Sequence, residues 1–545
     1  MKQLQIRILI LALALIPCNF ANAWNAFRNE TGLHNANITA SKTPTDSANT
    51  YIKWQHRFSE AAGTAYNSSP VITDTNLYVV CEDVLYELDK NGTVTRYLGL
   101  DGRMNSVCQT ALHENRIFIP LANGTMQCVD ITTMTSLWTS EAFGNQSLTT
   151  TLYRNGFVYA GTSHPNGSSG LFYCLNAETG ATVWTYTNEE FPCGFYWSGA
   201  CVFENNMVKG ILFGGDNGIL VSHSQTSPEV YDTYYVAGKI RAGVTYDEYT
   251  NAYYTTSTDG YLYKIQMNED GTFRAVSSLY LGSAPTDAIN CTSTPTICNG
   301  RIYVGSFYGT NGRLTVIDAA TLTEIYAVSD SACGDIKASP LLSTGYATDE
   351  NNGKAYVYVT HNKLPGGLYI LEDTSSNTNG ELKPLIAPTE GQQFCISSVV
   401  SDTDGTLYYS NDSGYLFAVA IGKAPIQTAS PMQTADTTPP KQPETIVSPT
   451  AAPQVVKKTK QPGKPSKVRW TIQRKKNGKY KVTLRWKKGT NTQKTCIQFK
   501  GKKKRFCKKT KAIFTLKKGR YTLYLTSYGA NSKKSQRVKR IVKIK

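Results

Sequence analysis

Hydrophobic and polar positions alternate along most of this chain in runs of five or six residues, which Gly, Asn and Asp separate. Such alternation is typical of half-buried β-strands joined by tight turns. One phrase recurs eight times, at a mean step of about 47 residues: a turn residue, then Leu or another apolar residue, then a β-branched residue or Leu. The copies are DVLYEL from Asp83, GTMQCV from Gly124, GLFYCL from Gly170, GILVSH from Gly218, GYLYKI from Gly260, GRLTVI from Gly312, GGLYIL from Gly366 and GYLFAV from Gly414.

Most copies follow a second strand-like run, such as NLYVV at Asn76 or RIYVG at Arg301, and several precede an aromatic such as Trp138 or Trp184. Four short antiparallel strands in each repeat predict the blade of a β-propeller. The last copy supplies only three strands, and an unassigned YIKW ends at Trp54. We therefore predict an eight-bladed propeller over residues 24–420, with its closing strand near residues 51–57.

Behind this repeat array the pattern changes twice. Residues 421–465 are rich in Pro and Thr and predict an extended linker. Residues 466–545 alternate again, in KYKVTLRW and RYTLYLTSYG, and predict a small β-sandwich that resembles a fibronectin type III or immunoglobulin-like domain. The fold class is therefore all-β: a propeller, a linker and a sandwich.

Charge separates the two folded parts. The chain has 57 Lys and Arg against 40 Asp and Glu, yet residues 464–545 contain 30 of the cations and no acid. Such an excess favours a polyanionic partner. Outside the cell we expect this partner to be an anionic polymer of the cell envelope or a surface protein, and no specific nucleic acid is expected. Phospholipid head groups and docking on the acidic propeller itself stay open as alternatives. The candidate contacts are Lys502, Lys503, Lys504, Arg505, Lys508 and Lys509.

The N-terminus predicts secretion. Lys2 and Arg7 precede an apolar run that ends before Ala21-Asn22-Ala23, which is the pattern of a cleaved signal peptide over residues 1–23. No later segment is apolar enough to span a membrane. We expect a protein that is secreted, associated with the cell envelope, and monomeric.

Cysteines complete the structural predictions. Of the 13, one lies in the signal peptide, and an even number in an oxidising compartment permits disulfides. The nearest pairs in sequence are Cys193 with Cys201, Cys291 with Cys298, and Cys496 with Cys507. No metal site is expected, because no C-x-x-C occurs and the six His are scattered.

Few residues suggest a site on the propeller. Phe195, Tyr196 and Trp197 stand together in CGFYWSGA, where they either contact a ligand at the rim or pore or pack between blades. His223 and His361 lie in or beside inner segments of their blades, as candidates for a central site or as buried polar residues. DTDG at Asp402 is predicted as a hairpin turn rather than a calcium loop.

Together these phrases resemble the repeat named after pyrroloquinoline quinone (PQQ), which quinoprotein dehydrogenases share with the propeller lipoprotein of the Gram-negative outer-membrane assembly machine. FYWSGA at Phe195, PGGLYILED at Pro365 and QQFCISSVVSDTDGTLYYS from Gln392 look closer to secreted surface propellers of Gram-positive anaerobes. The dehydrogenases use an Asp beside Ca²⁺ and a ring of adjacent cysteines. No adjacent Cys pair exists in this chain, so no cofactor is expected.

The function expected from these observations is that of a binding scaffold and not of an enzyme. The propeller would be the interaction module and the cationic domain an electrostatic anchor. Two alternatives stay open: an enzyme, either quinoprotein-like or carbohydrate-active, and an assembly factor by analogy with the outer-membrane lipoprotein.

Overall fold

The computed structural model describes residues 37–58, 69–105, 108–147, 149–282, 289–309, 311–424, 462–474, 479–492, 494–499, 505–507, 509–528, 535 and 538–544. The chain divides into two compact units, residues 1–430 and 431–545, which are taken separately below. The predicted signal peptide and most of the predicted linker lie outside the described residues. Among the residues described, no helix combines the length and the hydrophobicity needed to cross a bilayer.

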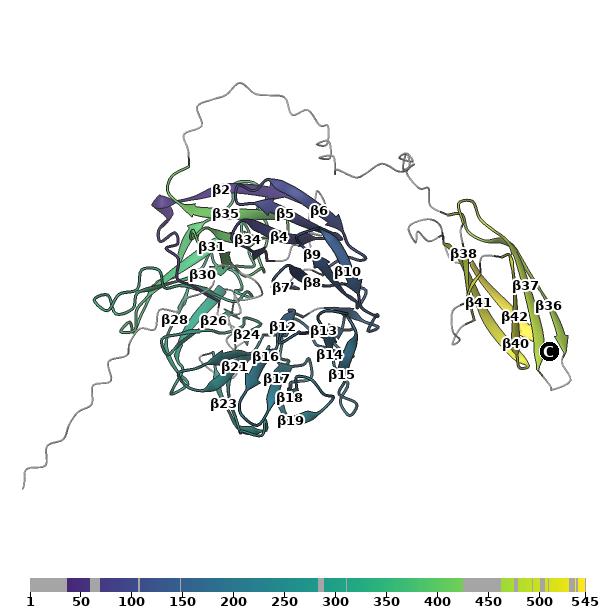
Figure 1. Ribbon diagram of the computed structural model, residues 1–545, viewed down its shortest axis with the longest axis horizontal. Coiled ribbons are helices and arrows are strands. Elements are labelled where there is room, and N and C mark those ends of the chain that lie inside the picture. The colour runs from purple at the N-terminus through teal and green to yellow at the C-terminus, as the bar shows by residue number, and fades with distance from the viewer. Residues whose placement is uncertain are drawn as a thin grey trace, which may run out of the picture. The chain divides into compact units, whose positions relative to one another are not determined.

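The described residues of the first unit form eight sheets, which follow one another around a common centre (Figure 1). We number them as blades 1 to 8 in chain order. Blades 1 to 4 contain β3 (Val71–Ile72), β4 (Asn76–Cys81), β5 (Val84–Asp89) and β6 (Val94–Gly99); β7 (Ala111–His113), β8 (Arg116–Pro120), β9 (Met126–Asp130) and β10 (Thr135–Thr139); β11 (Gln146–Ser147), β12 (Leu152–Arg154), β13 (Phe157–Ser163), β14 (Phe172–Asn176) and β15 (Thr182–Tyr186); and β16 (Cys201–Glu204), β17 (Lys209–Gly214), β18 (Ile219–Ser224) and β19 (Val230–Tyr235).

The second half of the ring repeats this antiparallel order. Blades 5 to 8 contain β20 (Thr245–Asp247), β21 (Ala252–Thr256), β22 (Tyr261–Met267) and β23 (Phe273–Tyr280); β24 (Ile289–Asn290), β25 (Thr296–Cys298), β26 (Arg301–Tyr308), β27 (Asn311–Asp318) and β28 (Thr323–Ser329); β29 (Leu341–Ser343), β30 (Ala355–Thr360), β31 (Leu368–Asp373) and β32 (Lys383–Ile386); and β33 (Val400–Ser401), β34 (Leu407–Ser410) and β35 (Tyr415–Ile421), joined by β2 (Thr50–Arg57). The all-β fold predicted from the alternation is therefore confirmed.

The core of the ring lies between neighbouring blades. Between blades 3 and 4, Phe172 stacks on Phe213 with ring centroids 4.0 Å apart, and Tyr159 and Ile211 belong to the same buried cluster. Both faces of the middle strands are covered, so β18 and β30 are buried along their whole length. Each large apolar side chain buried in this way contributes about 1.5–3 kcal/mol. A single blade could not bury both faces alone, which is why the sheets form a ring.

The first and last parts of the unit meet in blade 8. Strand β2 pairs antiparallel with β35, with Tyr51 opposite Ala420, and supplies the outer strand that the last copy of the repeat lacks. The sequence did not reveal a second contact: β1 (Ile38–Thr39) pairs in parallel with β29 of blade 7. A short 3₁₀ helix, η1 (Ser47–Asn49), connects this segment to β2.

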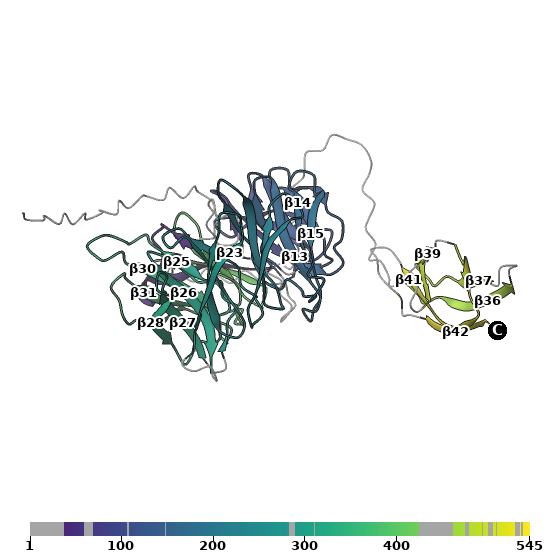
Figure 2. The same ribbon diagram turned by 90° about the horizontal axis from the view of Figure 1, so that it is seen from below.

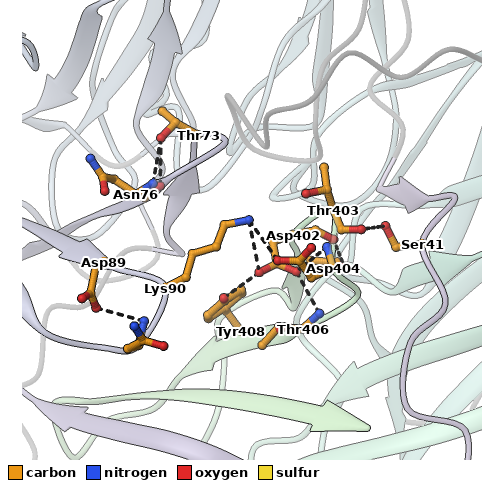
Figure 3. Close-up of polar contacts among 12 residues, drawn as sticks. Ser41, Thr73, Asn76, Asp89, Lys90, Asp402, Thr403, Asp404, Thr406 and Tyr408 are labelled. Atoms are coloured by element: carbon orange, nitrogen blue, oxygen red, sulfur yellow. Dashed lines mark hydrogen bonds and ion pairs between the residues drawn. The ribbon is translucent and has the colours of Figure 1, made fainter.

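Polar contacts reinforce the closure at the DTDG turn (Figure 3). Asp402 accepts the backbone N–H groups of Asp404 and Thr406 on Oδ1 and the Tyr408 hydroxyl on Oδ2. Lys90 of blade 1 lies 3.3 Å from Asp404 Oδ2 and 3.9 Å from Asp402 Oδ2. These contacts occupy the buried Asp402 carboxylate, so the segment acts as a turn that joins blades 8 and 1.

Tryptophans of the outer strands link consecutive blades. The indole N–H of Trp54 donates to the Lys90 carbonyl of blade 1, and that of Trp138 to the Ala177 carbonyl of blade 3. Gly92 and Gly180 in the receiving turns have φ of +84° and +71°, and a Cβ on either would lie 2.7 Å or less from the indole ring. Glycine is therefore needed at these two positions for two reasons: it allows the positive φ of the turn, and it leaves room for the indole ring.

The second unit contains two sheets. Strands β36 (Ser466–Arg474), β37 (Tyr480–Lys487) and β40 (Lys511–Leu516) form one, and β39 (Arg505–Cys507), β38 (Lys494–Phe499), β41 (Gly519–Tyr528) and β42 (Val538–Ile544) form the other (Figure 2). Leu484 and Trp486 of the first sheet share one buried cluster with Ile497 and Leu523 of the second. Two sheets over one core make this unit a small sandwich.

The three predicted disulfides are not formed. Within the described residues all twelve cysteines are thiols. Register explains the case of Cys496 and Cys507: Cys507 lies opposite Thr495, so Cys496, one residue further along, projects from the other face of the sheet. In the propeller, Cys201 lies on β16 within the core between blades 4 and 5, whereas Cys193 belongs to the core between blades 3 and 4. The third predicted pair is separated in the same manner, because Cys291 belongs to the core between blades 5 and 6, whereas Cys298 packs against the core between blades 6 and 7.

Candidate functional site: the axial channel of the propeller

A polar belt lies where the chain enters several of the blades. The Ser69 amide donates to Gln109 Oε1 (3.1 Å), Gln109 Nε2 donates to Ser69 Oγ (3.2 Å), and Ser69 Oγ donates to the Ser398 carbonyl (3.1 Å). The Ser339 amide donates to Ser398 Oγ at 3.1 Å. These bonds join blades 7, 8, 1 and 2.

The belt continues across blades 5 to 7. The Gly243 amide donates to Thr294 Oγ1 at 2.8 Å, and Ser293 Oγ donates to the Ala338 carbonyl at 2.8 Å. Small hydroxyl residues recur at this point of the repeat. Their presence in TSTP, KASP and ISSV is a sequence signal that the strand pattern alone did not reveal.

A cavity of about 50 Å³ lies inside the belt. Seven blades each contribute at least one lining residue to it. In chain order, and taking one residue from each blade, blades 2 to 8 contribute Gln109, Thr150, Trp197, Arg241, Thr292, Lys337 and Ile396. The two charged side chains of the described lining are therefore cations, and Thr292 lies on the blade between them.

Each of the two cations lies beside an aspartate that is not part of the described cavity lining. Asp216, 6% exposed, accepts two hydrogen bonds from Arg241, from Nε at 2.9 Å and from Nη2 at 2.6 Å. The Arg241 guanidinium also lies over the Tyr196 ring, 4.3 Å from its centroid. This arrangement fixes the guanidinium at the channel and leaves no rotamer freedom to lose on binding.

Lys337 has a different environment on the other side of Thr292. Its Nζ lies 3.6 Å from Asp335 Oδ2. Burial raises the pKa of Asp335 to about 6 and also raises the pKa of Asp412, while Lys337 partly offsets both effects. The hydroxyl of Thr292 has no hydrogen-bond partner among the described residues. The channel therefore offers two cations and one unpaired hydroxyl, and Asp335, whose pKa burial raises to about 6, lies beside Lys337.

The three predicted aromatic contacts separate in the structure. Phe195 is fully buried and packs edge-on against Phe172 at 5.5 Å, so it belongs to the core between blades. Tyr196 lies beneath Arg241, and Trp197 lines the cavity with φ of +60°, a strained conformation for an aromatic residue. Only Tyr196 and Trp197 remain candidates for ligand contact.

The histidines considered for a central site are packed into their blades. His223 stacks on Trp184 at 4.0 Å, and His361 Nδ1 accepts the Gly334 amide at 3.1 Å. Burial lowers the pKa of both imidazoles. Neither lines the cavity, and both are structural.

Most of the predicted polyanion contacts lie outside the described residues: Lys502, Lys503, Lys504 and Lys508. Arg505 belongs to β39, but only its backbone is described. Lys509 is exposed. The predicted polyanion site therefore stays a prediction.

Comparison with known proteins supports the fold. Residues 37–186 match the family model described as outer membrane protein assembly factor BamB. Quinohemoprotein alcohol dehydrogenases from Pseudomonas putida and Comamonas testosteroni are similar in structure, with TM-scores of 0.53 and 0.54, 11% identity, and coverage of 76% of this chain and 82% of theirs. BamB from Moraxella catarrhalis aligns with a TM-score of 0.49 at 15% identity, over 68% of this chain and 98% of its own. Among curated proteins, none matches the sequence.

At these identities the similarity to the two dehydrogenases shows the fold alone. The first unit is a β-propeller, and its residues 37–186 are similar to repeats of the PQQ type.

The channel does not fit the quinone that the dehydrogenases' names imply. Small-molecule sites usually measure about 300 Å³ or more, whereas the axial cavity measures about 50 Å³. Those residues also include no group of three or more His, Cys, Asp or Glu side chains placed to hold a metal ion. We therefore derive no chemistry through a quinone.

Proposed function

We propose that this protein is a secreted or envelope-associated binding scaffold. Its propeller serves as the interaction module, and its cationic sandwich holds anionic polymers of the cell envelope. The observation that carries the proposal is the charge of the second unit, where 30 cations occur over residues 464–545 without one Asp or Glu. Concentrated charge of this kind attracts polyanions and needs no specific pocket.

The experiment is the extraction of intact cells that produce the full chain, with rising salt. Exposed charge pairs are screened between about 0.05 and 0.5 M salt. We expect the protein to remain with the cells at the lower concentration and to appear in the medium at the higher one. Equal release at both concentrations would reject the anchor.

In the propeller, the proposed contact lies at the channel, where Tyr196, Trp197 and Arg241 come together. Fixed rings and a fixed guanidinium bind at low entropic cost. Replacing Trp197 with Ala is expected to abolish capture of a propeller ligand without changing salt extraction, because the anchor belongs to the other unit.

A carbohydrate-active enzyme is the second candidate. It is favoured by Asp335, whose pKa of about 6 suits a general acid near neutral pH. The test is turnover of a panel of envelope and plant polysaccharides by the purified chain and by Asp335→Asn. Product formed by the natural chain and not by the variant would support this candidate, and no product from either would exclude it for those substrates.

A further inference from the structure

The outer face of the three-stranded sheet in the second unit carries aligned cations. Arg469 of β36 lies directly opposite Arg485 of β37, which lies directly opposite Lys511 of β40. All three are exposed. Because opposite residues share a face and strands lie about 4.8 Å apart, the three form a straight row about 10 Å long. We call these residues the cationic row.

The row has no acidic counterpart in the sandwich strands, since residues 464–545 contain no Asp or Glu. Like charges directly opposite each other destabilise a sheet. Protection of an edge strand requires single, scattered charges, not a row that includes the central strand β37. Repulsion within the row therefore lowers the stability of the free protein, and an anion bound along the row offsets this repulsion.

The residues beside the row add polar groups and no aromatic ring. Thr471 lies opposite Thr483, which lies opposite Ile513, and Gln473 opposite Lys481 comes next. The rings of Trp470 and Phe514 pack against the core instead. Single-stranded nucleic acids are usually bound by stacking on exposed rings, and the described residues of this face offer none. The face therefore suits a polymer whose recognition depends on its charges.

We propose that the cationic row binds a linear phosphodiester polymer of the cell envelope. The inference rests on the proposed anchor and specifies its face and its ligand chemistry. Two of the three cations are Arg, whose planar guanidinium donates two parallel hydrogen bonds to one phosphate. Successive phosphates of an extended chain laid across the strands would meet successive members of the row.

The test compares the full chain with two triple variants. R469Q/R485Q/K511Q removes the row. R520Q/K539Q/K543Q removes the same charge from exposed positions of β41 and β42 on the other sheet. The probe is synthetic poly(glycerol phosphate), with polyglutamate and a single-stranded oligonucleotide as the other arms, titrated at several salt concentrations. Hydrogen exchange of residues 466–544 verifies that each variant is folded.

We expect loss of the row to weaken binding of poly(glycerol phosphate) roughly 30-fold at low salt, and the control triple to weaken it about 3-fold or less. The slope of log affinity against log salt should fall by about two to three for the row variant. Equal losses in both variants would overturn the inference and leave the proposed anchor intact. Tighter binding of the oligonucleotide or of polyglutamate would also overturn it. Absence of binding to every polyanion by the natural chain would reject the anchor itself.

Discussion

The two units use charged residues in opposite ways. In the propeller, Arg301 is 6% exposed and Asp373 is fully buried, and the two form an ion pair at 3.0 Å. Asp373 also accepts the hydroxyls of Tyr303 (2.7 Å) and Tyr326 (2.6 Å). In the sandwich, exposed cations lie opposite one another, and residues 464–545 contain no Asp or Glu. Removing a buried, paired charge should therefore destabilise the first unit, whereas removing an exposed charge of the cationic row should stabilise the second.

The largest effect is expected for Asp373→Asn. Arg301 would then remain buried without its counter-ion, at a cost of about 3–5 kcal/mol in the free energy of unfolding. Urea unfolding of the full chain measures it. Lys383→Gln, which breaks the exposed pair with Glu381 at 2.9 Å, is the control and should leave the midpoint unchanged. Equal losses of stability in the two variants would mean that the buried ion pair contributes no more to the propeller than the exposed one.

The closure of the ring should depend on Trp54. Trp54→Ala removes an indole that bonds to Lys90 and packs 5.8 Å from Tyr408, so we expect a loss of about 2–3 kcal/mol. Trp138→Ala, at the equivalent position between blades 2 and 3, is the matched control for stability. Limited proteolysis should cut residues 38–57 faster in the Trp54 variant only. Similar cleavage in both variants would contradict the role of Trp54 in closure.

Asp335 should impose a pH dependence on the propeller. Its folded-state pKa of about 6 lies above the unfolded value of about 3.9. The folded state then binds more protons between these values, and stability falls as pH rises from about 4 to 6, by about 1–2 kcal/mol. Asp335→Asn should flatten this part of the curve. Urea titrations at pH 4, 5, 6 and 7 measure the difference, and an unchanged slope would count against the shifted pKa.

The smallest effect has the opposite sign. Arg485→Thr removes the middle charge of the cationic row and should stabilise the sandwich by about 0.2–1 kcal/mol at low salt. Hydrogen exchange of residues 466–544 measures it in the full chain. About 1 M salt should abolish the gain, because the Debye length falls to about 3 Å. Lower protection in the variant would mean that Arg485 has a structural partner.

The strand pattern was readable from the sequence because it depends on neighbouring residues. Alternation and turn residues indicated the segments that form β5, β9 and β14. The last repeat lacks one strand, and this indicated that the segment ending at Trp54 completes it. The polar belt was harder to find, since single Ser, Thr and Gln residues at the blade entries carry no periodicity of their own. Within CGFYWSGA, the sequence could not show that Phe195 faces the core while Trp197 faces the channel.

By itself, then, the sequence determined the all-β repeat and the segregation of charge, because both are written in residue types and local spacing. Only the tertiary structure decided the pairings: β1 beside blade 7, Cys496 and Cys507 on opposite faces, and Arg469, Arg485 and Lys511 in one row. A shift of one residue in strand register reverses every side chain of a strand. Register depends on contacts between segments distant in the chain, and these form only when the sheets assemble.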